Sequence, residues 1–269
     1  MNTQYVKTKL IGIFGEKPVA FIQALRFVYL HFAEHVMDPE VALIPKLLQD
    51  GDTAIDVGAN GANWTYWLHK SVGRKGIVYA FEADPYYAIA TNLAIKFMHL
   101  KNIRLFPFGL SDVSERIALR VEDADGSRLI GKSRVDRSAK IDDTAIRYVD
   151  LRRLDSMIHD HPRLAFTRLI KCDVEGYELF VFRGATEILE RARPVVIMET
   201  GNFELQGYST SDVYDFFHQR SYDCFALTGD STLSRTNTSL DHEKAISVNR
   251  ILLPREKLDS IRKVIRISE

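Results

Sequence analysis

The sequence is poor in cysteine, in long apolar runs and in excess charge of either sign. Its two cysteines, Cys172 and Cys224, lie far apart in the chain and form no Cys-x-x-Cys pair. A disulfide framework and a zinc site are therefore disfavoured, and a reducing cytoplasm is the expected location. The chain has 36 basic and 36 acidic residues, so its charge balance gives no reason to expect a nucleic acid partner.

No apolar run is long enough to predict a transmembrane segment. Residues 21–32 form the most apolar part of the N-terminal region, but Gln23, Arg26 and His31 interrupt them, which also argues against a signal peptide. We interpret residues 1–48 as an N-terminal helical cap, with peripheral membrane contact as an alternative for its amphipathic part. Residues 49–269 are long enough to form one α/β domain.

The clearest pattern in the chain is a strand, a glycine turn and a helix over residues 52–69. An apolar run ends at Asp56 and breaks into the turn GANG, which begins at Gly58 and ends at Gly61. Both glycines can adopt backbone angles that are closed to other residues, and both let a ligand approach bare backbone. The pattern is typical of the first strand of a doubly wound sheet, where ligands bind at the carboxyl ends of strands.

The turn departs from the dinucleotide fingerprint G-x-G-x-x-G, because Asn60 and Asn63 stand where that fingerprint has its second and third glycines. A carboxylate at Asp56 repels phosphates but suits a ligand that has an amino group and a positive sulfonium. A second apolar run ends at Glu82, where a carboxylate can accept both ribose hydroxyls of an adenosine. These features indicate S-adenosylmethionine, with a nicotinamide-dependent oxidoreductase as an alternative.

Apolar runs and helical patterns alternate along the rest of the chain. They predict an α/β fold, a doubly wound Rossmann-like sheet of seven mostly parallel strands with helices on both faces and an antiparallel last strand. Residues 117–150 break this order with short alternating runs and an Asp-Gly pair at 125 and 126, which predicts a hairpin-like insertion. A helix is expected over 151–158, and Ser211 is expected to cap a helix that ends at His218.

The fourth predicted strand carries a lysine and is followed by acids. Lys171 and Asp173 are two residues apart and therefore point to one face of the sheet. Asp173 is expected to orient a hydroxyl or accept its proton, with Lys171 balancing the negative charge. Asp173, Glu175, Glu178 and Glu199 also offer the hard oxygen ligands that magnesium prefers, so a metal is an option. Stabilisation of a helix dipole is the alternative for Glu175 and Glu178.

A loop at residues 109–112 follows the third predicted strand. Its backbone groups and the carboxylate of Asp112 could bind the exocyclic amine of an adenine. A simple turn that Asp112 caps is the alternative.

Four separated motifs between residues 50 and 205, taken together, resemble the FkbM-type methyltransferases, a branch of the class I S-adenosylmethionine-dependent enzymes. The motifs are DVGANGANWTYWL, FEADPYYAIATNLAI, the GLSD loop, and IKCDVEGYELFVFRGATEIL followed by RPVVIMETGN. The resemblance implies a class I methyltransferase domain that transfers a methyl group to a hydroxyl of a small-molecule or carbohydrate acceptor. A non-catalytic S-adenosylmethionine-binding module is the alternative. Carried over by residue, the resemblance places Asp56, Gly58, Asn60 and Gly61 at the methionine end of the cofactor, Glu82 at the ribose, Ser111 with Asp112 at the adenine, and Asp173 with Glu175 beside the methyl group.

Overall fold

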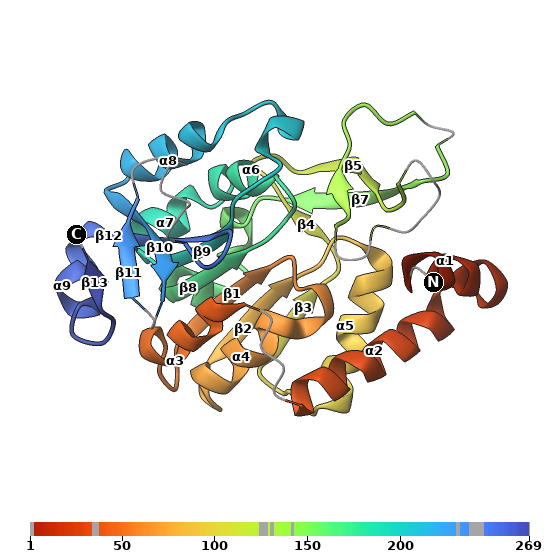
Figure 1. The fold of residues 1–269 in the computed structure, drawn as a ribbon, viewed down its shortest axis with the longest axis horizontal. Coiled ribbons are helices and arrows are strands. Elements are labelled where there is room, and N and C mark those ends of the chain that lie inside the picture. The colour runs from red at the N-terminus through yellow and green to blue at the C-terminus, as the bar shows by residue number, and fades with distance from the viewer. Residues whose placement is uncertain are drawn as a thin grey trace.

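The computed structural model describes residues 3–33, 38–123, 129, 132–140, 143–229, 232–236 and 245–268. In these residues a nine-stranded mixed sheet crosses the molecule, with helices on both of its faces (Figure 1). The strand order is β13-β11-β10-β12-β9-β8-β1-β2-β3. The strands are β1 (Thr53–Val57), β2 (Ile77–Phe81), β3 (Ile103–Phe106), β8 (Thr167–Cys172), β9 (Val195–Glu199), β10 (Tyr222–Thr228), β11 (Thr232–Arg235), β12 (Asn249–Pro254) and β13 (Ile267–Ser268).

The sheet contains the strands that the sequence predicted and two more. The short strands β11 and β13 extend it beyond β10, so the predicted count of seven strands was too low. The pairs β2–β3, β1–β2, β1–β8 and β8–β9 are parallel, whereas β12 is antiparallel to both β9 and β10. The chain order reverses between β1 and β8, and ligands bind at such a switch point in open α/β sheets.

Alternate residues of the central strands face two apolar cores, one on each side of the sheet. Ile55 of β1 packs in a core with Phe182, whereas its neighbour Ala54 packs in a second core with Leu68. Burial on both faces is the reason that these strands read as continuous apolar runs in the sequence. The helices that cover the faces are α3 (Ile44–Leu47), α4 (Asn63–Val72), α5 (Pro85–Phe97), α6 (Glu178–Arg183), α7 (Thr186–Arg191), α8 (Thr210–His218) and α9 (Leu258–Ile261).

The N-terminal region is helical, as predicted. Helices α1 (Thr3–Phe14) and α2 (Glu16–Phe32) precede a 3-10 turn at Pro39–Leu43. Val19 and Ala20 of α2 pack against Tyr87 of α5, so α2 lies along the outer side of α5 (Figure 1). Across the described ranges, every helix is too short or too polar to cross a bilayer.

The predicted insertion forms a second, four-stranded sheet with the order β4-β7-β5-β6. β5 is antiparallel to both β6 and β7, which agrees with the hairpin-like pattern of the sequence. The Asp-Gly pair at 125 and 126 lies outside the described residues. The strands are β4 (Gly109–Leu110), β5 (Glu115–Arg120), β6 (Arg134–Val135) and β7 (Ile146–Arg152).

Two local predictions were wrong. The expected helix over 151–158 is the end of β7 followed by a 3-10 turn at Asp155–Met157. Leu151 and Arg152 pair with β4 instead, because the second sheet supplies hydrogen-bonding partners that a local sequence pattern does not reveal. The cap of α8 is Ser209 rather than Ser211, since Ser209 and Asp212 form a reciprocal capping box.

Candidate active site

A cleft opens at the carboxyl ends of β1, β2 and β8, where the second sheet covers the main one. The space between its walls is about 730 Å³, part of which is open to solvent. Five residues that the sequence singled out line it together. They are Gly58, Asn60, Glu82, Asp173 and Glu175.

Gly58 is required by the close approach of β8 to the turn after β1. Its φ is +85°, and a Cβ at this position would lie 1.9 Å from the carbonyl oxygen of Asp173. The amide of Asp173 in turn donates to the carbonyl oxygen of Val57 over 2.9 Å. The glycine therefore sets the distance between the cleft's first turn and the strand end that carries Asp173.

Glu82 is buried at the end of β2 and faces the cleft. Its two carboxylate oxygens accept the amides of Asn60 over 2.8 Å and of Asp84 over 2.9 Å. Burial, and then the charge of Asp84, raises the pKa of Glu82 to about 8. The glycine turn and the acid are thus one unit, in which Glu82 holds Asn60 against the end of β2.

Asp56 and Gly61 lie outside the lining of the cleft. The buried carboxylate of Asp56 accepts the hydroxyl of Thr65, and burial raises the pKa of Asp56 to about 6. At Gly61 the ring of Phe27 occupies the space that a Cβ would need, at 2.1 Å from it. Both residues hold the turn against its neighbours, and their contact with a cofactor stays a prediction.

Ser111 and Asp112 also lie outside the lining. The Ser111 hydroxyl donates to Asp112 Oδ1 over 3.2 Å, and the Tyr177 hydroxyl lies 3.2 Å from the Ser111 oxygen. Gly109 and Leu110, which precede them in the same motif, line the cleft instead. The structure thus brings the loop to the cleft through different residues from those predicted, and the adenine contact stays a prediction.

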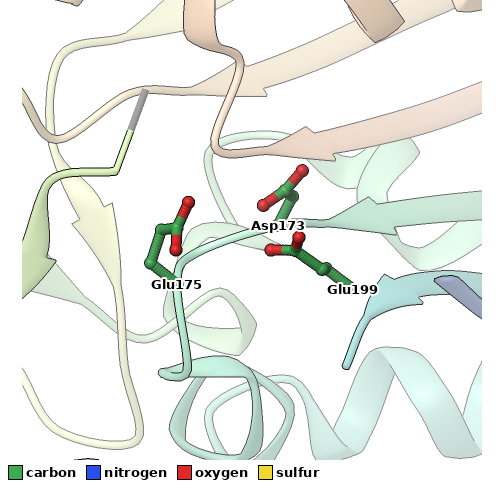
Figure 2. A group of neighbouring side chains, drawn as sticks. All are labelled: Asp173, Glu175 and Glu199. Carbon is green, nitrogen blue, oxygen red and sulfur yellow. The ribbon is translucent and has the colours of Figure 1, made fainter. Parts of the chain in front are cut away.

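Asp173, Glu175 and Glu199 form an acidic cluster beside the cleft, with carboxylate oxygens that lie within 4.8 Å of one another. Figure 2 shows these side chains converging from the ends of β8 and β9 and from the turn after β8. Burial, and then the negative charge of Asp173, raises the pKa of Glu199. Because ionised carboxylates this close together repel one another, the cluster is stabilised when two of them share a proton or when a cation binds between them.

Glu178, the fourth predicted metal candidate, is not part of this cluster. Its side chain is buried, and one carboxylate oxygen accepts the amide of Val174 over 2.9 Å. The other oxygen has no hydrogen-bonding partner among the residues that the structure describes. Burial raises the pKa of Glu178 to about 8, so this residue is mostly a neutral carboxyl group of the core at pH 7.

Lys171 is buried behind Asp173 and supports it. Its ammonium group lies 3.5 Å from Asp173 Oδ2 and donates to Asn249 Oδ1 over 2.8 Å. Asn249 donates to the buried carboxylate of Glu40 over 3.0 Å, and the ring of Trp64 lies 5.1 Å from the ammonium group. Asn249, itself held by Glu40, therefore positions Lys171, and Lys171 in turn positions the carboxylate of Asp173.

Several residues of the site were missed by the sequence reasoning. Tyr177 lines the cleft and accepts a hydrogen bond from Arg137 over 2.8 Å. Ser133 also lines it and donates to Asp84 over 2.8 Å. The position of Tyr177 inside the motif IKCDVEGYEL was the one available signal.

Each strand of the second sheet adds one apolar side chain to the lining of the cleft: Leu110, Leu119, Val135 and Leu151.

Comparison with known proteins decides the family. The family model of the methyltransferase FkbM domain matches residues 56–224, which include the glycine turn, Glu82 and the acidic cluster. The chain belongs to this FkbM methyltransferase family. Its domain is that of an S-adenosylmethionine-dependent methyltransferase, so the alternative of a nicotinamide-dependent oxidoreductase is withdrawn. No curated protein matches the chain.

Solved structures similar to this FkbM family member include the methyltransferase FkbM of Methylobacillus flagellatus KT. The two are 14% identical with a TM-score of 0.48, and the match covers 87% of this chain and 59% of that protein. An rRNA methylase of Streptococcus thermophilus is 11% identical, with a TM-score of 0.43 and coverage of 81% and 94%. A Streptococcus mutans protein in complex with SAH is 14% identical, with a TM-score of 0.43 and coverage of 81% and 95%. Identities this low do not transfer a substrate to this chain.

Proposed function

We propose that this chain transfers the methyl group of S-adenosylmethionine to a hydroxyl oxygen of a small molecule or sugar. The observation that carries the proposal is the position of Asp173. Asp173 directly follows β8, the strand that pairs with β1. Its side chain is 37% exposed, and the residue lines the same cleft as Gly58 and Glu82. It is thus open to an acceptor while its neighbour Lys171 is closed off from solvent.

The residues of the cleft fit the cofactor that the family implies. Gly58 has no side chain, which permits close approach to its backbone, and the carboxylate of Glu82 can accept hydroxyl donors such as those of a ribose. When bound, S-adenosylmethionine would supply an electrophilic methyl carbon on a positive sulfonium, with the neutral thioether as the leaving group when an acceptor oxygen bonds to that carbon. The protein's task is to align that oxygen and to take up its proton.

Asp173 is the group that we assign to this task. A carboxylate is a weak base for an alcohol, so Asp173 orients the hydroxyl and accepts its proton late in the transfer. Lys171, held by Asn249, keeps the carboxylate in place at 3.5 Å. Glu175, on the same cleft, is assigned to the acceptor side of the site.

An acceptor screen with labelled cofactor tests the function. We expect label in a product that survives mild alkali, because a methyl ether is stable and a carboxyl ester is not. Label released by alkali would contradict transfer to a hydroxyl. Binding of the cofactor with no transfer to any sugar or small hydroxylated molecule would instead support a non-catalytic module, and transfer only to RNA would move the acceptor to another class.

Glu82 should couple cofactor binding to pH. We expect micromolar affinity for S-adenosylmethionine, and a loss of about 1 to 3 kcal/mol in Glu82→Gln because charge-assisted hydrogen bonds to the ribose are lost. The pKa of about 8 means that Glu82 is mostly protonated at pH 7 without ligand, and hydroxyl donors favour its ionised form. Wild-type affinity should therefore rise from pH 6 to pH 8 with proton release. Calorimetry in buffers of different ionisation enthalpy measures both effects.

Glu122→Gln, which changes a carboxylate outside the lining of the cleft, is the control for this experiment. It should bind cofactor as the wild type does at each pH. Equal affinity and equal proton release in Glu82→Gln and the wild type would remove Glu82 from the cofactor site.

The acidic cluster offers oxygen ligands for magnesium, and we propose that the cation assists turnover. We expect activity to fall severalfold after exhaustive chelation and to return when magnesium is added. Glu199→Gln should weaken this response, because it removes one of the converging carboxylates. Rates that chelation leaves unchanged would assign the three acids to orientation and proton transfer alone.

A further inference from the structure

Helix α2 is apolar on two opposite faces. Its inner face packs on the body of the protein, where Val19 and Ala20 meet Tyr87 and the ring of Phe27 covers Gly61. A helix at the edge of a globular domain normally turns polar side chains outward. α2 does not, so its outer face calls for a separate explanation.

The outer face carries five large apolar side chains that are 46% to 75% exposed. At about 100° per residue they fall within an arc of about 100°, opposite the buried face. Ile13 and Phe14, at the end of α1, are similarly exposed. We call the five side chains the outer stripe: Phe21, Ile22, Leu25, Tyr29 and Phe32.

Basic residues border the outer stripe on both sides. On the same helical projection Lys17 and Arg26 lie about 40° beyond its two edges. Both are exposed, and neither forms an ion pair with a residue in the described ranges. Along α2 and α5, both described in full, the one acid is Glu16, which lies 3.8 Å from Arg147. This side of the protein is therefore basic, although the whole chain has a formal net charge of zero.

Phe97 extends the apolar surface onto α5. Its ring lies 5.6 Å from that of Phe21, in an edge-to-face arrangement. Lys96, the residue before it, and Lys101, just after the helix, are both exposed. The surface that combines apolar and basic side chains thus extends over both α2 and α5.

We propose that the outer stripe docks on an anionic lipid bilayer, with α2 lying in the plane of the interface. Large apolar side chains would enter the boundary between headgroups and acyl chains, while Lys17 and Arg26 would reach back to lipid phosphates. The charge of the surface decides between this partner and a second copy of the chain. Across a two-fold axis the basic borders would meet other basic borders, with Glu16 the one acid of the helix to offset them.

Flotation of the full-length protein with vesicles tests this proposal. We expect at least about tenfold more binding to phosphatidylcholine vesicles that contain about 30% phosphatidylglycerol than to phosphatidylcholine alone. The double variant Tyr29→Ser/Phe32→Ser should lose about tenfold of this binding through its apolar contacts. Lys17→Gln/Arg26→Gln should lose a similar factor, and about 0.5 M salt should mimic that loss in the wild type.

Matched controls separate the stripe from general surface effects. Phe166 is 72% exposed and ends the 3-10 turn before β8, outside both α2 and α5, so Phe166→Ser should bind vesicles as the wild type does. Arg153→Gln/Lys263→Gln removes two exposed charges elsewhere and should do the same. Circular dichroism and the thermal unfolding midpoint verify that each variant is folded.

Two results would overturn the proposal. One is that wild-type protein fails to float with anionic vesicles, or that the stripe variant floats equally well. The other is a wild-type dimer in analytical ultracentrifugation that Tyr29→Ser/Phe32→Ser converts to a monomer without any change in lipid binding, which would assign the stripe to a second copy.

Discussion

Asp173→Asn should reduce turnover by about 100-fold or more while cofactor affinity changes little. The substitution keeps the shape of the side chain but removes the charge that would accept a hydroxyl proton. It also removes the partner of Lys171, which lies 3.5 Å away and remains tied to Asn249. Single-turnover kinetics at saturating cofactor, together with calorimetry, separate the transfer step from binding.

Asp160→Asn is the matched control, because Asp160 is an exposed aspartate outside the cleft lining. It should leave both turnover and affinity unchanged. If Asp173→Asn lost cofactor binding and kept its turnover at saturation, Asp173 would belong to the binding site and the proposed role would fail. Unfolding curves of both variants show whether the loss of charge beside buried Lys171 has altered the fold.

Gly58→Ala should destabilise the protein by about 2 to 5 kcal/mol and abolish cofactor binding at micromolar concentrations. The added methyl group must adopt a φ of +85° and would lie 1.9 Å from the carbonyl oxygen of Asp173. That neighbour is backbone, so it cannot rotate away as a side chain can. The turn and the end of β8 must then separate, which moves Asp173 relative to the cleft. Denaturant unfolding and calorimetry measure the two effects.

Gly12→Ala provides the comparison for this variant. Gly12 lies within α1 and has no positive φ, and a methyl group added there would meet no atom within 4 Å among the described residues beyond its two chain neighbours and the backbone of its own helix. Alanine in a helix interior is favoured over glycine by up to about 1 kcal/mol, so this change should be neutral or slightly stabilising. Similar unfolding free energies for the two variants would show that the turn tolerates a side chain at Gly58.

The sequence predicted the central part of the fold well, because it is encoded locally. Four central strands, β1, β2, β8 and β9, are buried on both faces, and each reads as a short apolar run followed by or ending in a glycine or an acid. Glu82 is an example, since it follows the second strand as predicted, and the structure places it beside the turn at Gly58, where it accepts the amide of Asn60. The short strands β11 and β13 carry no such signal, because edge strands depend on the neighbours that they pair with.

Other parts of the site depend on contacts between distant segments. Asn249 and Glu40 support Lys171 although 209 positions separate them, and no local pattern marks either residue. The apolar wall from the second sheet is equally hidden, because short alternating runs do not tell which face will meet the cleft. Asp56 shows that a clear sequence motif does not by itself reveal how a residue is used. It was predicted to lie at the methionine end of the cofactor, whereas its carboxylate is buried outside the cleft lining and accepts a hydrogen bond from Thr65.

The place of β12 has a consequence for synthesis on the ribosome. This strand lies between β9 and β10, although it follows both in the chain. Until residue 254 has left the exit tunnel, the edge of β9 lacks its native partner and is open to pairing with other chains. Asn249 arrives with the same strand, so the nascent chain cannot complete the support of Lys171 before residues 249–254 emerge. The site thus stays incomplete until β12 has been synthesised and has paired with β9, which ties catalytic competence to the emergence of this strand.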